Sequence, residues 1–155
     1  MNSITITLKE MKKTFLITLL LITTLSYSQD WKTNFEETQK EAVAQNKPIL
    51  LVFSGSDWCA PCIKLDKNIW QSEEFKKYAL DNLVLLRADF PKKKANALPE
   101  AIKKGNLALA EKYNKEGFFP LVVLLDSSGK VLGKKGFENT TATKYITDLK
   151  AFQKK

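Results

Sequence analysis

Three apolar runs stand out in the pattern of hydrophobic and polar positions along the chain. They are Pro48–Phe53, Leu83–Asp89 and Leu121–Leu125. Runs of this length predict strands, and the near-continuous hydrophobicity of the second fits a parallel strand with both faces covered. The third run is followed by a turn at Asp126–Gly129 and a shorter strand at Lys130–Gly133, which together predict a β-hairpin.

Segments with apolar residues at helical spacing lie between these strands. The predicted helices are Asp30–Asn46, Ala60–Trp70, a segment capped by Ser72, Asn106–Lys115 and Asn139–Gln153. Residues expected on their core-facing sides include Trp31, Gln45, Ile63, Leu107 and Tyr145. The mixture of strands and helices indicates an α/β protein, and 155 residues suggest one folded domain.

The stretch Pro91–Gly105 fits neither pattern. It contains Pro99 and five lysines, namely Lys92, Lys93, Lys94, Lys103 and Lys104. A solvated loop with a short helix accounts for this composition. The alternative is a docking surface for an acidic partner.

Residues 1–28 have the composition of a secretory signal peptide. Lys12 and Lys13 precede the short apolar run 14–22, and a small-x-small cleavage site ends at Ser28. The apolar run is shorter than the roughly 20 residues that a spanning helix needs, which disfavours the alternative of an uncleaved membrane anchor. We therefore expect export, to a bacterial periplasm.

Cleavage at this site would leave Gln29 as the first residue of a mature domain, 29–155. Met11 begins the signal more naturally than Met1, so residues 1–10 form a possible upstream extension. Removing the signal takes away three lysines and one glutamate, which leaves 22 basic and 16 acidic residues and a net charge of +6. This charge is moderate, and no arginine-rich stretch or aromatic series points to a nucleic-acid partner.

The only two cysteines of the chain lie in the segment Trp58–Cys62, whose sequence is Trp-Cys-Ala-Pro-Cys. They follow the strand that ends at Phe53 and the linker Ser54–Asp57, and they begin a predicted helix. Polar sites of open α/β sheets lie at such carboxyl ends of strands. The free N–H groups and the dipole of a helix N-terminus stabilise an anion, so the Cys59 thiolate should be nucleophilic near neutral pH.

Other uses of two cysteines fit less well. A zinc site needs about four ligands, and the chain has no histidine to complete one. A structural disulfide would close a very short loop and stabilise little. Inert buried thiols are not expected beside Gly55, Ser56 and Asp57. A Cys-x-x-Cys pair after a strand is instead typical of a redox-active dithiol.

The segment Lys47–Cys62 resembles the active-site strand, loop and helix start of the thioredoxin superfamily. The order of elements extends this resemblance over nearly all of residues 30–153. The resemblance implies a thioredoxin fold, in which a central mixed sheet is flanked by helices, with the Lys-rich stretch as an insertion before the helix that precedes a cis-proline. Phe119–Pro120 occupies the position of that proline, so the bond is expected to be cis and to lie against the dithiol.

The resemblance also implies the roles of the site residues. Cys59 would attack a partner disulfide, and Cys62, one turn deeper and less exposed, would resolve the mixed disulfide. Trp58 would cover the dithiol and contact the partner, and Pro61 would restrict the helix start and influence the redox potential. The backbone next to Pro120 would pair with an extended substrate segment, and Phe119 would add an apolar contact.

Two departures from the family pattern matter. Thioredoxins carry a buried acid six positions before the first cysteine, where this chain has Phe53. Asp57 is close in sequence, but its loop position makes it a weak substitute as proton acceptor. Strongly oxidising relatives often carry a histidine between the cysteines, where this chain has Ala60 and Pro61. A less stabilised thiolate makes a less oxidising couple.

The leading hypothesis is therefore an exported enzyme, a thiol:disulfide oxidoreductase that reduces or isomerises disulfides of secreted proteins. It would act as a monomer without cofactor or metal on protein substrates with disulfides or thiols, and a membrane reductant is a candidate electron donor. Two alternatives stay open. One is an oxidase that inserts disulfides, and the other is a binding or chaperone module that uses the same fold.

Overall fold

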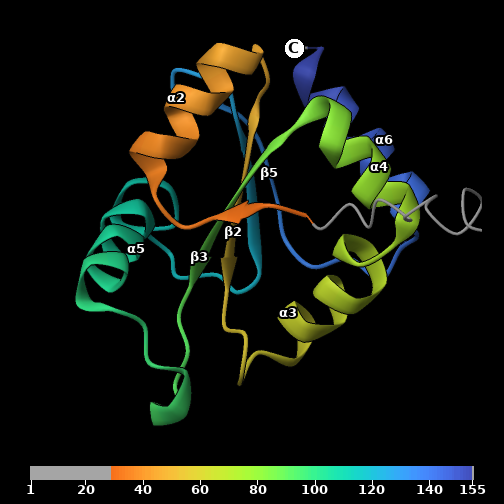
Figure 1. Ribbon diagram of the computed structural model, residues 1–155. Helices are drawn as coiled ribbons and strands as arrows, with labels where there is room; N and C mark the ends of the chain where they lie inside the picture. The colour runs from red at the N-terminus through yellow and green to blue at the C-terminus, as the bar shows by residue number, and fades with distance from the viewer. Residues whose placement is uncertain (1–28, 155) are drawn as a thin grey trace, which may run out of the picture.

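Five strands form one mixed sheet in the computed structural model, which describes residues 29–154 (Figure 1). In spatial order they are β1 (Trp31–Lys32), β3 (Val84–Asp89), β2 (Ile49–Ser54), β4 (Leu121–Leu125) and β5 (Val131–Lys135). Strands β1, β3 and β2 are parallel, whereas β4 runs antiparallel to β2 and β5 runs antiparallel to β4. The mixed sheet expected from the sequence is confirmed. The predicted signal peptide lies outside the described residues.

Helices cover both faces of the sheet (Figure 1). On one face lie α2 (Phe35–Gln45) and α5 (Glu100–Tyr113). On the other face lie α3 (Ala60–Leu65), the π-helix η1 (Asp66–Trp70), α4 (Glu73–Asn82) and α6 (Ala142–Gln153). A short 3-10 helix, η2 (Lys94–Asn96), lies in the connection between β3 and α5.

Strand β2 lies in the middle of the sheet and divides the core into two halves. Leu50 and Val52 belong to the half that contacts α4 and α6, whereas Leu51 and Phe53 belong to the half that contacts α2 and α5. Successive side chains of a strand point to opposite faces, so a run that is apolar at every position is stable only between two helical layers. The buried strand predicted at Pro48–Phe53 is therefore confirmed, and the covered parallel strand predicted at Leu83–Asp89 is confirmed as β3, which lies beside it.

Capping side chains set two helix starts that differ from the predicted ones. The side chains of Asn34 and Thr141 each accept a hydrogen bond from an N–H in the first turn of the helix that follows. Helix α2 therefore begins at Phe35 rather than at Asp30, and α6 begins after Thr141 rather than at Asn139. Asn, Thr, Ser and Asp are favoured at this position because they satisfy the free N–H groups of the first turn.

Strand β1 was missed, and the prediction that Trp31 and Gln45 face the core from one helix was wrong. Trp31 pairs with Leu85 of β3, and its ring centroid lies 5.9 Å from that of Trp70 on the opposite side of the sheet from α2. Gln45 is exposed. A strand of two residues is too short to show the alternation by which strands are predicted.

The Lys-rich insertion is shorter than the predicted range Pro91–Gly105. Helix α5 begins at Glu100 instead of Asn106, so the irregular segment is residues 91–99, which we call the basic loop. Pro99 immediately precedes the helix, where the missing N–H of proline removes no helical hydrogen bond.

Two residues expected to pack against the core are instead exposed. Ile63 of α3 is 48% exposed and Leu107 of α5 is 53% exposed. Leu109 and Tyr113 form the buried side of α5. Gly105, which suggested a boundary, lies within α5 at a position with open space around it. The error at Leu107 arose because α5 was started at Asn106 and Gly105 was taken as a boundary; Ile63 lies in α3 and is a separate error.

Candidate functional site

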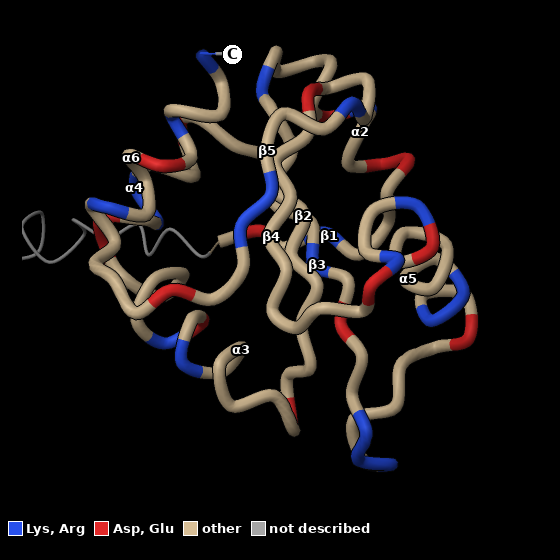
Figure 2. The backbone as a smooth tube through the Cα atoms, turned by 180° about the vertical axis from the view of Figure 1, so that it is seen from behind, with Lys and Arg blue, Asp and Glu red and all other residues tan. Residues whose placement is uncertain are grey.

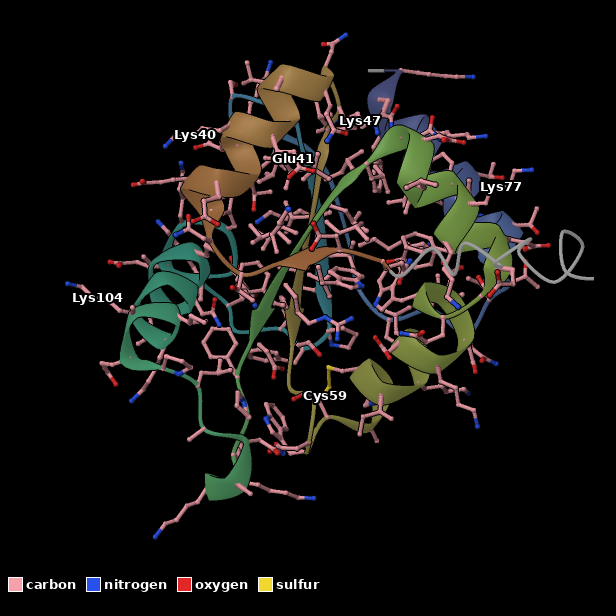
Figure 3. The ribbon with its side chains drawn as sticks, in the orientation of Figure 1. Lys40, Glu41, Lys47, Cys59, Lys77 and Lys104 are labelled. Carbon is pink, nitrogen blue, oxygen red and sulfur yellow. A yellow bond between two sulfur atoms is a disulfide. The ribbon has the colours of Figure 1, made fainter. Side chains whose placement is uncertain are left out.

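Cys59 and Cys62 form a disulfide at the start of α3, directly after the carboxyl end of β2 (Figure 3). The Cys59 N–H donates to the Gly55 carbonyl at 2.9 Å, which closes the linker into a tight turn. The Cys59 sulfur is the N-cap of α3 and accepts a hydrogen bond from the Cys62 N–H at 3.3 Å. The first reactive sulfur therefore lies where the helix presents its free N–H groups.

Both sulfur-bearing residues are buried in this oxidised form. Cys59 is 4% exposed and Cys62 is 3% exposed, so these fractions do not distinguish an attacking from a resolving thiol. The assignment of those roles stays a prediction. Pro61 is the second residue of α3 and is exposed, in a position where proline is compatible with the helix.

Trp58 lies over the linker that precedes the cysteines. Its indole N–H donates to the Phe90 carbonyl at 2.7 Å, and its ring centroid is 5.5 Å from that of Phe119. Phe90 and Phe119 are themselves in edge contact, with centroids 5.4 Å apart. Three aromatic rings from three separate segments thus form one cluster beside the disulfide, and Trp58 remains 39% exposed at its surface.

The Phe119–Pro120 peptide bond is cis, as predicted. Leu121, the next residue, pairs with Phe53 of β2, which brings Pro120 to the end of the sheet where β2 enters the cysteine linker. Pro120 is buried and Phe119 is partly buried. The structure therefore brings Trp58, the cysteine pair and Phe119–Pro120 to one edge of the sheet, although they lie about 60 positions apart in the sequence.

Phe53 is fully buried in the core between the sheet and helices α2 and α5. Its neighbours in this cluster are apolar and include Leu51, Ala88 and Leu121. The place at which thioredoxins keep a buried acid is therefore apolar in this protein, as the sequence indicates.

Asp57 forms its hydrogen bonds with residues 92–96 and not with the cysteines. Its carboxylate accepts hydrogen bonds from the N–H of Lys92 at 2.9 Å, the N–H of Lys93 at 3.0 Å and the side-chain amide of Asn96 at 2.9 Å. The bond from Lys92, helped by those from Asn96 and Lys93, lowers the pKa of Asp57. A carboxylate held in this way is a poor proton acceptor, so Asp57 connects the cysteine linker to the basic loop instead.

Sequence reasoning missed Asp89 and Phe90 at the carboxyl end of β3. Asp89 accepts hydrogen bonds from the N–H and the hydroxyl of Ser56 at 2.9 and 2.6 Å, while the Phe90 carbonyl holds Trp58. The signal was present, because β3 is parallel to β2 and the carboxyl ends of parallel strands lie at the same edge. Polar residues that end the second apolar run were therefore candidates to support the linker.

This fold and this cysteine pair define a class of protein. The family model described as Thioredoxin-like matches residues 30–127, and the chain belongs to that family. With a Cys-x-x-Cys pair in the family's characteristic place, the chain is a thiol:disulfide oxidoreductase.

Among curated proteins, the chain is 38% identical over 121 residues to Disulfide bond reductase DsbH of Chlamydia pneumoniae, covering 78% of this chain and 70% of DsbH. It is 31% identical over 114 residues to Thioredoxin-related protein DsbJ of the same organism, covering 73% of this chain but only 32% of DsbJ. The chain thus spans about a third of DsbJ.

Solved structures agree with this placement. The structure of a DsbH oxidoreductase superposes with a TM-score of 0.76 at 36% identity, covering 86% of this chain and 92% of the other. A thioredoxin from Thermus thermophilus superposes with a TM-score of 0.57 at 12% identity, covering 80% and 87%. At that identity the second likeness supports the thioredoxin fold alone.

Proposed function

We propose that the protein is an exported thiol:disulfide oxidoreductase that reduces or isomerises the disulfides of secreted proteins. The observation that carries this proposal is the Cys59–Cys62 pair at the N-terminus of α3, on the same sheet edge as the cis Phe119–Pro120 bond. The similarity to a relative named as a disulfide bond reductase supports the reducing direction.

The proposed reaction moves two electrons from the protein to its substrate. The Cys59 thiolate attacks one sulfur of the substrate disulfide, forms a mixed disulfide and releases the first substrate thiolate. The Cys62 thiolate then attacks the Cys59 sulfur, releases the second substrate thiolate and leaves the Cys59–Cys62 disulfide seen in the structure. Each released thiolate takes up a proton from water. A dithiol donor, such as a membrane reductant, must then reduce the protein again.

The residues around the pair would bind the substrate chain. The backbone beside Pro120 would form hydrogen bonds with an extended segment, in the manner of strand addition. Phe119 and the exposed face of Trp58 would contact the apolar side chains next to the substrate cysteine. Pro61 would keep the first turn of α3 fixed while the sulfurs exchange.

Export is proposed from the composition of residues 1–28, with the bacterial periplasm as the destination. Within residues 29–154, no helix is long and apolar enough to cross a membrane.

The direction of the reaction is tested by the reduction potential of the Cys59–Cys62 pair, measured by equilibration with a defined thiol buffer. With Phe53 buried in an apolar cluster and no histidine in the chain, we expect a potential of about −270 mV, in the range of thioredoxin. A value of about −120 mV, as in strong periplasmic oxidants, would instead make disulfide insertion the leading function.

The roles of the two cysteines are tested by trapping. Cys62→Ser should accumulate mixed disulfides with substrate proteins, because the first attack still occurs and the second cannot. Cys59→Ser is the matched control and should trap little. If Cys59→Ser is the variant that traps, the two roles are reversed.

A further inference from the structure

The basic loop is fastened to the linker that carries the cysteines. Asp57, two residues before Cys59, accepts hydrogen bonds from the backbone of Lys92 and Lys93 and from the side chain of Asn96. These partners lie 35 to 39 positions further along the chain. Three hydrogen bonds to one carboxylate hold the loop in a defined place, which a merely solvated loop does not require.

The loop also contributes to the surface around the disulfide. The Lys92 ammonium lies 3.9 Å from the centroid of the Trp58 ring, and the carbonyl of Phe90, just before the loop, holds the Trp58 indole N–H. Figure 2 shows lysines at the end of the loop where it projects from the sheet, and Figure 3 shows that the same end of the molecule carries Cys59. A substrate segment that contacts Trp58 would therefore pass close to these charges.

The Asp57 carboxylate offsets part of the positive charge of the loop, but it binds N–H groups and not the lysine ammonium groups. Residues 91–99 contain three lysines and no acidic residue, a net charge of +3, and the next residue is a glutamate. That glutamate, Glu100, lies 3.8 Å from Lys103. In the part of the chain that the structure describes, no ion pair involves Lys92, Lys93 or Lys94, and all three are exposed.

We propose that the basic loop is a substrate-selecting surface, which binds aspartate or glutamate side chains next to the disulfide of an extended polypeptide. The inference rests on the proposed function and adds the chemistry of the preferred substrate. Exposed lysines raise the local concentration of an acidic partner and speed its association. The hydrogen bonds of Asp57 to the backbone of Lys92 and Lys93 keep these lysines close to the linker that carries Cys59.

The test uses two synthetic peptides of the same sequence around one disulfide, with either glutamate or glutamine at the flanking positions. The mature protein is assayed for kcat/KM with each peptide, at low and at high ionic strength. The same peptides with serine in place of cysteine are titrated against the protein, which measures binding without redox chemistry. Four proteins are compared: the wild type, Lys93→Gln with Lys94→Gln, Lys93→Glu with Lys94→Glu, and a control with Lys40→Gln and Lys77→Gln. The control lysines lie away from Cys59 (Figure 3).

We expect the wild type and the control to prefer the glutamate peptide about three- to tenfold in low salt, and to lose this preference in high salt. The glutamine variant should bring the ratio close to one, and the glutamate variant should invert it. Equal rates and equal binding of the two peptides by the wild type would overturn the proposal, as would an unchanged preference in the Lys93 and Lys94 variants. Absence of reduction with either peptide would reject the proposed function, and the serine peptides would still decide whether the basic loop binds acidic chains.

Discussion

A methyl group at Gly55 provides a sharp test of the packing around the site. A Cβ atom built at this position would lie 2.4 Å from Cε2 and 2.6 Å from Nε1 of the Trp58 indole. The ring is rigid, so it can make room only by leaving its place. The backbone of Gly55 is not in the left-handed region, so the effect of Gly55→Ala comes from Trp58 alone.

The size of the effect follows from what the displaced indole loses. It loses the hydrogen bond to the Phe90 carbonyl, which contributes about 1 kcal/mol, and the edge contact with Phe119, which contributes about 0.5–1.5 kcal/mol. The contact with the Lys92 ammonium adds about 0.5–1 kcal/mol. The lower ends of these ranges add up to about 2 kcal/mol, so we expect Gly55→Ala to lower the free energy of unfolding by about this amount.

The measurement is urea unfolding of the oxidised protein, followed by circular dichroism, in a double-mutant cycle with Trp58→Ala. In the Trp58→Ala background, adding Gly55→Ala should change the free energy of unfolding by less than about 0.5 kcal/mol. Gly105→Ala is the matched control, because this glycine is helical with open space around it and alanine there should stabilise by about 0.5–1 kcal/mol. An equal loss with and without the Trp58 ring would refute the reasoning.

Three further predictions concern Asp57, Tyr145 and the N-terminus. Hydrogen bonding lowers the pKa of Asp57, so the stability that this carboxylate contributes is complete above the ordinary carboxyl pKa of about 3.9 and is lost as the pH falls through the lowered pKa. Asp57→Asn should therefore make the thermal midpoint fall less steeply as the pH is lowered from 6 to 2. Tyr145→Phe should keep the thermal midpoint or raise it, since the hydroxyl is buried without a hydrogen-bond partner among the described residues, and a clear fall would contradict this. N-terminal sequencing of the exported protein should begin at Gln29, and a protein that begins at Met11 would show that the signal is not cleaved.

The places of the candidate site residues in the fold could be predicted because each part of the site is a short contiguous segment. Trp58, Cys59, Pro61 and Cys62 lie within five positions, and Pro120 directly precedes a strongly apolar strand. Each part therefore showed both its chemistry and its place at a strand end without knowledge of distant contacts.

What could not be predicted depends on contacts between distant segments. The hydrogen bonds of Asp57 join residues 35 to 39 positions apart, and no local pattern indicates them. The start of α5 was misplaced because Gly105 weakens a helix on average, whereas here it lies on an exposed face beside the buried Asn106 and Leu109. Tertiary packing outweighs the local preference at such positions.

The two outer strands of the sheet limit how other chains can pair with it. Strand β1 has only two residues, and β5 carries Lys134 and Lys135, whose ammonium groups bind the Tyr113 carbonyl and the Asp148 carboxylate. Short strands and lysines at a sheet edge oppose the addition of a foreign strand, which is a common route to aggregation. Another chain that approaches this protein therefore finds few free backbone groups along the two edges of the sheet.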